Sequence, residues 1–262
     1  MRTIAIANLK GGTGKTATCH ALGTALAREC GRYVLLVDCD PQGSLTASCG
    51  IQTTADKSLA AVLDRSFDRA IDLELLMYHI MHRVSPGLDL LPAHLELARS
   101  EQRLVLRKQP ELILRHALAN VAFRYHVALL DCPAEVGLLT TSALAAADAV
   151  LIPTVPNIVD LRALRLFLDV LQDVKKRLNP RLEILGVLIT FFDSRTAHHH
   201  RIAHAMRGLA LPVLDVMIKR SIAIAEAPNV SKSVVDYQPR HDQAEAYMQL
   251  AAVVDRWISA HV

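Results

Sequence analysis

A glycine-rich segment near the start of the chain constrains the fold more than any other feature. It lies between the apolar run Ile4–Ala7 and the helix-period segment Thr16–Glu29. Its residues are Lys10, Gly11, Gly12, Thr13, Gly14, Lys15 and Thr16. Glycines let successive backbone N–H groups turn towards one anion, and the helix behind them adds roughly half a positive charge at its N-terminus. The segment therefore predicts a phosphate-binding loop between a strand and a helix.

Single residues of this loop have expected roles in binding Mg-ATP. The Lys15 ammonium group would reach the β- and γ-phosphates, and the Thr16 hydroxyl would ligate Mg²⁺. We count Ala17, the next residue, among the nucleotide-binding residues. Leu9 stands where the strict loop pattern has its first glycine, and Lys10 stands beside it. An ordinary glycine-rich turn is the alternative, but the strand before and the helix after disfavour it.

Apolar runs and helix-period segments alternate along the rest of the chain. The expected strands are Ile4–Ala7, Val34–Val37, Leu88–Leu91, Val127–Leu130, Ala149–Ile152 and Ile184–Thr190. The expected helices are Thr16–Glu29, Glu111–Ala122, Val136–Ala147, Asp160–Leu178, Ala197–Leu209 and a final one over Gln243–Ile258. Strands that are apolar throughout are typical of a parallel sheet covered on both faces. We predict an α/β fold, a doubly wound and mostly parallel sheet of the P-loop NTPase type, in a single domain over residues 1–262.

Composition excludes several classes of protein. Although 52% of the residues are hydrophobic, no apolar run reaches the roughly 20 residues of a membrane-spanning helix. The 5 cysteines include no Cys-x-x-Cys pair, which disfavours a disulfide framework or a zinc ribbon. We therefore expect a cytoplasmic protein with reduced thiols. The net charge of +3 is too small to indicate nucleic-acid binding, which would need a local basic patch.

Three aspartates follow or end expected strands. Asp38 and Asp40 follow Val34–Val37, and Asp131 follows Val127–Leu130. Ligands of open parallel sheets bind at the carboxyl ends of the strands, so all three carboxylates can face the phosphates. We expect Asp38 to position the attacking water, and Asp40 and Asp131 to support Mg²⁺ together with the loop threonine. For Asp40 the alternative is a simple turn before a proline.

These motifs, taken in order, resemble the ParA/Soj family of partition ATPases, a deviant-Walker group that also includes MinD. The resemblance covers nearly the whole chain. It rests on the loop at 10–16, on the Asp-Cys-Asp-Pro-Gln-Gly segment at 38–43, on Asp-Cys-Pro at 131–133, on Thr-Phe-Phe-Asp-Ser-Arg at 190–195 and on Glu-Ala-Pro at 226–228.

The resemblance implies further functions for single residues. Lys10 would cross the interface of an ATP-dependent homodimer and touch the partner's phosphates, which adds it to Lys15 and Asp38 as a catalytic residue. Thr190, Ile218 and Lys219 would line the adenine pocket.

It also implies that the ATP-bound dimer binds DNA without sequence preference and associates with the nucleoid. The candidate DNA contacts are Arg195, Lys219, Arg220 and Lys232. A ParB-like centromere-binding partner would stimulate slow ATP hydrolysis, and plasmid or chromosome segregation would follow from that cycle. Ala223 stands where the family often has an arginine, which leaves the DNA contacts open.

Other functions of such a switch remain open. It could position a cargo other than a replicon, or the fold could serve a metabolic enzyme. A MinD-like membrane switch would require a basic amphipathic helix at the C-terminus, but the segment 256–262 carries little positive charge. We therefore expect no membrane partner.

Overall fold

One mixed sheet organises the computed structural model, which describes residues 1–68, 70–208 and 211–261. The sheet has eight strands in the order β3-β4-β2-β5-β1-β6-β7-β8. Their bounds are β1 (Arg2–Ile6), β2 (Val34–Asp38), β3 (His82–Ser85), β4 (Leu88–Leu91), β5 (Val127–Asp131), β6 (Ala149–Thr154), β7 (Glu183–Phe192) and β8 (Val213–Lys219). Neighbouring strands pair in parallel except β3 and β4. The predicted doubly wound, mostly parallel sheet is confirmed.

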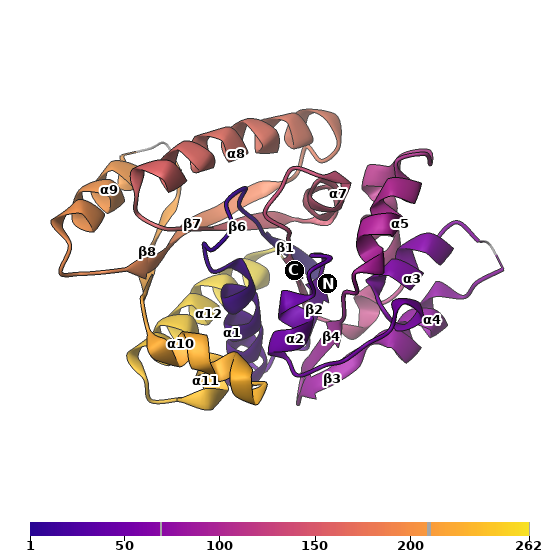
Figure 1. The fold of residues 1–262 in the computed structure, drawn as a ribbon, viewed down its shortest axis with the longest axis horizontal. Coiled ribbons are helices and arrows are strands. Elements are labelled where there is room, and N and C mark those ends of the chain that lie inside the picture. The colour runs from indigo at the N-terminus through magenta and orange to yellow at the C-terminus, as the bar shows by residue number, and fades with distance from the viewer. Residues whose placement is uncertain (69, 209–210, 262) are drawn as a thin grey trace.

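Helices cover both faces of this sheet (Figure 1). One face packs against α3 (Leu59–Arg65), α4 (Leu73–Ile80), α5 (Glu96–Leu104), α6 (Ile113–Ala119), α7 (Leu138–Ala146) and α8 (Ile158–Arg177). The other face packs against α1 (Lys15–Glu29), α2 (Ser44–Ser48), α10 (Ile222–Glu226), α11 (Val234–Tyr237) and α12 (Asp242–Ala260). The helix α9 (Ala197–Arg207) packs against residues of β7, next to the edge strand β8. Short 3₁₀ turns are η1 (Ala55–Lys57), η2 (Pro110–Leu112), η3 (Ala122–Arg124) and η4 (Ala227–Val230).

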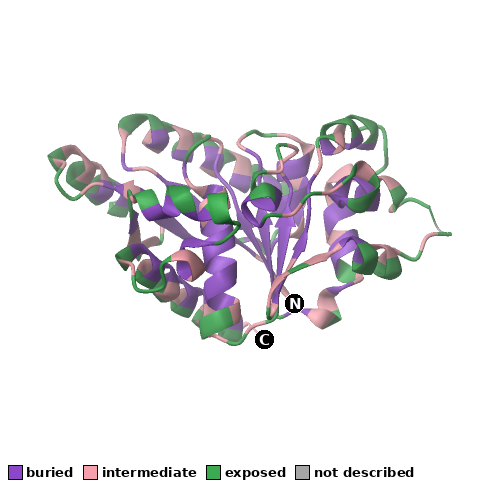
Figure 2. Cartoon of the chain, turned by 60° about the horizontal axis from the view of Figure 1, so that its bottom comes forward, coloured by how far each residue is buried: buried purple, intermediate pink, exposed green. Residues whose placement is uncertain are grey.

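The central strands are buried because both of their faces are covered. Every residue of β2 and β5 is buried, which explains their unbroken apolar sequences. Figure 2 shows the buried strands between helices whose outer turns are exposed. The helix α12 buries Leu250, Val254 and Ile258 against α1, and these residues recur at the spacing of one helix face.

The structure differs from the sequence prediction at the two edge strands of the sheet and in several helices, and α2 to α5, α10 and α11 were not expected. The strands β3 and β8 were not expected, because their residues are only partly buried and do not form a continuous apolar run. The segment predicted as one helix over Glu111–Ala122 divides into η2 and α6. The helix expected over Ala197–Leu209 ends at Arg207, and Leu209 lies outside the described residues.

The two ends of the chain lie close together, in the middle of the view in Figure 1 and below the strands in Figure 2. Arg2 begins the central strand β1 at its amino end. At the C-terminal end of α12, the Trp257 Nε1–H group donates to Glu183 Oε2 at 3.2 Å, and Glu183 begins β7. Both termini therefore lie near the amino ends of the strands, whereas the glycine-rich loop follows the carboxyl end of β1.

Candidate nucleotide-binding site

The glycine-rich loop has the backbone conformation that its sequence predicts. Gly12 and Gly14 have φ values of 74° and 84°, in the left-handed region that favours glycine. A Cβ atom on Gly14 would also lie 3.3 Å from the Phe191 ring. The Thr190 hydroxyl donates to the Thr13 carbonyl at 2.8 Å. The end of β7 thus supports the loop from one side.

The N-terminus of α1 is open to an anion. Gly14 is its N-cap, no side chain caps it, and its first turn contains no acidic residue. The first N–H groups of any helix lack partners within the helix, and the helix dipole favours negative charge at this end. The backbone of Lys15, Thr16 and Ala17 can therefore receive a phosphate group.

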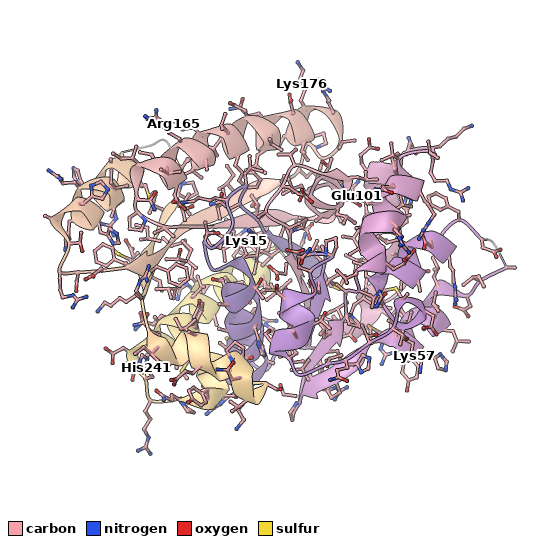
Figure 3. All side chains as sticks on the ribbon, in the orientation of Figure 1. Lys15, Lys57, Glu101, Arg165, Lys176 and His241 are labelled. Carbon is pink, nitrogen blue, oxygen red and sulfur yellow. The ribbon has the colours of Figure 1, made fainter. Side chains whose placement is uncertain are left out.

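The Lys15 side chain turns back into the loop. It is buried, and its Nζ atom donates to the Lys10 carbonyl at 3.2 Å. Burial lowers the pKa of Lys15, while the nearby Asp131 acts in the opposite direction. Figure 3 shows Lys15 in the middle of the molecule, above α1 and beside the ends of the central strands. An anionic phosphate at this position would add a strong partner for the ammonium group.

Asp131, at the end of β5, is a carboxylate without a partner. It is 1% exposed, and among the described residues neither of its oxygens has a hydrogen-bond partner. Burial raises the pKa of Asp131 well above its usual range, and the neighbouring Asp38 raises it further. A buried carboxylate of this kind fits a divalent cation, because hard cations such as Mg²⁺ prefer oxygen ligands. The Thr16 hydroxyl lies near enough to lower the pKa of Asp131, although no hydrogen bond joins the two side chains, and it is the second protein oxygen of the predicted set.

A cation at this place would need ligands beyond these side chains. In the described part of the chain, no cluster of three or more His, Cys, Asp or Glu side chains could hold a metal ion by itself. Mg²⁺ commonly uses one or two protein ligands, substrate phosphates and water. The residues therefore fit a magnesium ion that arrives with a nucleotide.

Asp38 anchors its own loop. Its Oδ1 atom accepts from the Asp40 N–H at 3.2 Å. Its Oδ2 atom accepts from the Thr46 N–H at 2.8 Å and from the Thr46 hydroxyl at 2.7 Å. The Asp38 side chain is fully buried, and burial raises its pKa to about 6 against the opposing effect of the Thr46 hydrogen bonds. Both oxygens already have partners within the loop, so this carboxylate supports the segment 38–46.

Asp40 is more accessible than Asp38. It is partly exposed, and its Oδ1 atom accepts from the Gln42 N–H at 2.9 Å. Its carbonyl accepts from the Gly43 N–H, also at 2.9 Å, which confirms the turn that Asp-Pro predicts. The water-positioning role expected for Asp38 stays a prediction, and this geometry favours Asp40 for it.

The residues expected to line the adenine pocket are buried to different extents. Ile218 is 1% exposed and belongs to the core beneath α12, while Lys219 is exposed and Thr190 supports the loop. A cavity of about 510 Å³ adjoins Thr16 and Ala17. Lys232, predicted from the sequence as a DNA contact, also lines it. The sequence prediction did not include the other lining residues, which are His20, Ser44, Ala47, Ser48, Ile224, Ala227, Pro228, Asn229, Ser233 and Val234.

The candidate DNA-binding residues lie in two places. Arg195, Lys219 and Arg220 gather at the carboxyl ends of β7 and β8, because Lys219 pairs with Phe192 across the two strands. The guanidinium group of Arg195 is held by Asp193 at 2.9 Å, and that of Arg220 lies 6.0 Å from the Phe191 ring. Lys232 lies apart from them, at the rim of the cavity beside Thr16.

The fold and this site define a P-loop nucleotide-binding protein. Its sequence matches the family described as an AAA domain over residues 1–184. It is 37% identical to the chromosome partitioning protein ParA of Caulobacter vibrioides, over 97% of this chain and 94% of that protein. It is also 37% identical to the sporulation initiation inhibitor protein Soj of Bacillus subtilis, over 97% of this chain and 98% of that protein.

The chain is also similar to solved structures over nearly its whole length. A structure described as cobyrinic acid a,c-diamide synthase from Mycobacterium smegmatis, with bound ADP and magnesium, has a TM-score of 0.84 and 35% identity. The matched region spans 99% of this chain and 96% of that chain. The chain therefore belongs to the ParA/MinD family of P-loop ATPases.

Proposed function

We propose that this protein is a partition ATPase that binds Mg-ATP, forms a dimer around the nucleotide and binds DNA non-specifically in that state. The observation that carries the nucleotide part is the position of Asp131. Its buried, unpartnered carboxylate lies near Lys15 and Thr16, at the open N-terminus of α1. The M. smegmatis structure, which contains ADP and magnesium, supports the same ligands here.

Different residues of the site would bind different parts of Mg-ATP. The Gly11–Thr13 backbone and the N-terminus of α1 receive the phosphates, and Lys15 neutralises their charge in a buried setting. Thr16 and Asp131 would hold the magnesium ion, with Asp40 near its outer ligands, and the ion would neutralise charge on the phosphate oxygens. The adenine end would lie beside Thr190 or along the cavity that begins at Ala17.

For hydrolysis we propose Asp40 as the residue that orients the attacking water. Asp38 is fully buried and has donors on both oxygens, whereas Asp40 is partly exposed at the same loop. Asp40→Ala should bind ATP and remain an ATP dimer, with hydrolysis reduced by about tenfold or more. Asp38→Asn should mainly lower stability. If Asp40→Ala hydrolysed ATP normally and Asp38→Asn did not while staying folded, the first assignment would be the correct one.

Exposed apolar side chains around the site support a dimer. Leu95, Val136, Ile158 and Val159 are 65%, 55%, 51% and 61% exposed. They follow β4, β5 and β6, so all lie at the edge of the sheet that carries the loop. Apolar groups gathered around a ligand site are typical of an interface between proteins. Lys10 lies at the same edge, where the resemblance to partition ATPases places it in contact with the partner's phosphates.

DNA binding is proposed for the basic residues at the ends of β7 and β8. Lys219 and Arg220 are exposed, and in a dimer their number would double. Arg195 and Lys232 would add weaker contacts, since Arg195 is paired with Asp193 and Lys232 lies farther away. Contacts to phosphates make such binding independent of sequence and sensitive to salt. A ParB-like partner would reset the cycle by stimulating slow hydrolysis, and the ATP-bound form would associate with the nucleoid.

An electrophoretic shift of non-specific duplex DNA tests this proposal. The purified protein is assayed with ATP, with ADP and without nucleotide, at two salt concentrations. Binding only with ATP, weakened by salt, is the expected result. The variant Lys219→Ala/Arg220→Ala should bind less, whereas Lys57→Ala/Arg65→Ala, a matched loss of two exposed charges, should bind normally. Absence of binding with every nucleotide would refute the DNA part and favour a switch that positions protein cargo.

Membrane binding is not part of the proposal. Among the residues that the structure describes, no helix combines the length and apolar composition needed to cross a bilayer.

A further inference from the structure

The loop lysine Lys10 is held within its own chain. Its Nζ atom donates to Asp160 Oδ2 in an ion pair. The Lys10 side chain is 35% exposed, but that of Asp160 is 0% exposed. The second oxygen, Oδ1, is buried and has no hydrogen-bond partner among the described residues. Lys10 is therefore the charged partner of a carboxylate that water does not reach.

Hydrogen bonds hold the backbone in place at both residues of this ion pair. Asn8 Nδ2 donates to the Pro153 carbonyl at 2.8 Å, and Asn8 Oδ1 accepts from the Lys10 N–H at 3.1 Å. This amide joins the start of the loop to the end of β6. At the start of α8, Asn157 Oδ1 accepts from the Asp160 N–H at 2.8 Å. Asp160 is thus placed in the first turn of a 20-residue helix, where it cannot follow Lys10 outwards.

We propose that Asp160 is a positioning residue that withholds Lys10 from a second copy of this chain until nucleotide phosphates compete for it. This inference rests on the proposed dimer, in which Lys10 reaches the phosphates of the partner. Ile158 and Val159, exposed two positions and one position before Asp160, place the ion pair at the edge of the same apolar surface.

The same ion pair also explains why Lys10 returns to Asp160 once the phosphate charge decreases. When Lys10 leaves, Asp160 keeps its buried position but loses this charged partner. A buried charge without a partner is strongly unfavourable, so the carboxylate draws the lysine back once the phosphate charge decreases. The switch therefore needs the full charge of ATP to remain in the dimeric state, and ADP cannot replace it.

The variant Asp160→Asn tests this proposal, because it removes the charge and keeps the size. Dimer formation is followed by sedimentation velocity as a function of ATPγS concentration with Mg²⁺. In the wild-type protein only the fraction of molecules that has released Lys10 can dimerise, which lowers the apparent affinity for ATPγS. The ATPγS concentration at half-maximal dimerisation, the midpoint, should therefore be roughly tenfold lower in Asp160→Asn. Partial dimerisation with ADP is also expected. An unchanged or higher midpoint in a folded variant would overturn the proposal.

A double-mutant cycle separates positioning from a general structural effect. Lys10→Ala itself should weaken the dimer, because the contact to the partner's phosphates is lost. Since Asp160 should matter only through Lys10, Lys10→Ala and Lys10→Ala/Asp160→Asn should dimerise to the same extent at every ATPγS concentration. If Asp160→Asn shifted the midpoint equally in both backgrounds, the residue would act by another route and the proposal would be wrong.

A second measurement does not depend on the dimer. Lys10 in the nucleotide-free protein is labelled with an amine-reactive acetylating reagent, and the rate is compared with that of the exposed Lys57 by mass spectrometry. Lys10 should react roughly tenfold more slowly than Lys57, and Asp160→Asn should remove most of that difference. Equal rates in the wild-type protein would refute the ion pair. A wild-type protein with slow Lys10 labelling but no ATP-dependent dimer would refute the proposed function and leave the pairing intact.

Discussion

Thr46 should contribute more to stability than its size suggests, because one hydroxyl joins three segments. It donates to Asp38 Oδ2 at 2.7 Å and accepts from the Ala93 N–H at 2.9 Å, and the residue is only 5% exposed. Thr46→Val keeps the shape but removes both bonds. A bond to a charged group contributes about 1.5–3 kcal/mol, and a buried N–H without a partner costs about 1–3 kcal/mol. We expect a loss of about 3 kcal/mol in the free energy of unfolding.

Urea denaturation at pH 7, without nucleotide, measures this loss. Thr24→Val is a matched control, since Thr24 is 2% exposed and its hydroxyl donates to the His20 carbonyl at 2.9 Å, within α1. A bond within one helix connects no separate segments, so the control should lose about 1 kcal/mol or less. Equal losses in the two variants would show that the hydroxyl of Thr46 does not hold the loop of Asp38, and our interpretation of that loop would fail.

Three further predictions concern the site. Burial raises the pKa of Asp38 from 3.8 to about 6 and that of Asp131 well above its usual range, so the folded state holds protons that the unfolded state releases. The stability of the nucleotide-free protein should therefore fall by about 2 kcal/mol or more between pH 4 and 7, measured by urea midpoints, and a flat profile would contradict this. Gly14→Ala should abolish nucleotide binding, because φ is 84° and the new Cβ would meet Phe191. Gly31→Ala, at φ 63° and with no described neighbour within 4 Å of the new Cβ, should be similarly strained but bind normally in an ATP fluorescence titration. Lys15→Ala should lose ATP binding while keeping its thermal midpoint, and calorimetric binding as tight as wild type would refute the role of this lysine.

Local patterns predicted the parts of the site that are close in sequence. The loop at 10–16 and the strand-end position of Asp131 follow from glycine spacing and from an apolar run that ends in a carboxylate. The pairing of Lys10 with Asp160 joins residues 150 positions apart, and no local pattern indicates it. The burial of Asp38 depends on the turn that brings Thr46 back to it, so the sequence could show two aspartates but could not separate their environments.

The edges of the sheet were harder to predict than its centre. Central strands such as β5 are apolar throughout, because helices cover both faces. In β8, Asp215 and Lys219 interrupt the apolar residues, since this edge strand is partly exposed to solvent. Of this strand only Ile218 and Lys219 entered the sequence prediction, as residues of the adenine pocket and, for Lys219, as a DNA contact, so the strand itself was not expected.

The position of the chain ends has a practical consequence for studying this protein in cells. Residue 1 and the end of α12 lie near the amino ends of the strands, whereas the phosphate loop, Asp131 and the exposed apolar residues around the site lie at the carboxyl ends. A fluorescent protein fused to either end would therefore point away from the nucleotide and from the proposed dimer surface. Tagged molecules imaged one at a time should report the behaviour of the untagged switch, and the same ends could attach the protein to a glass surface without blocking the site.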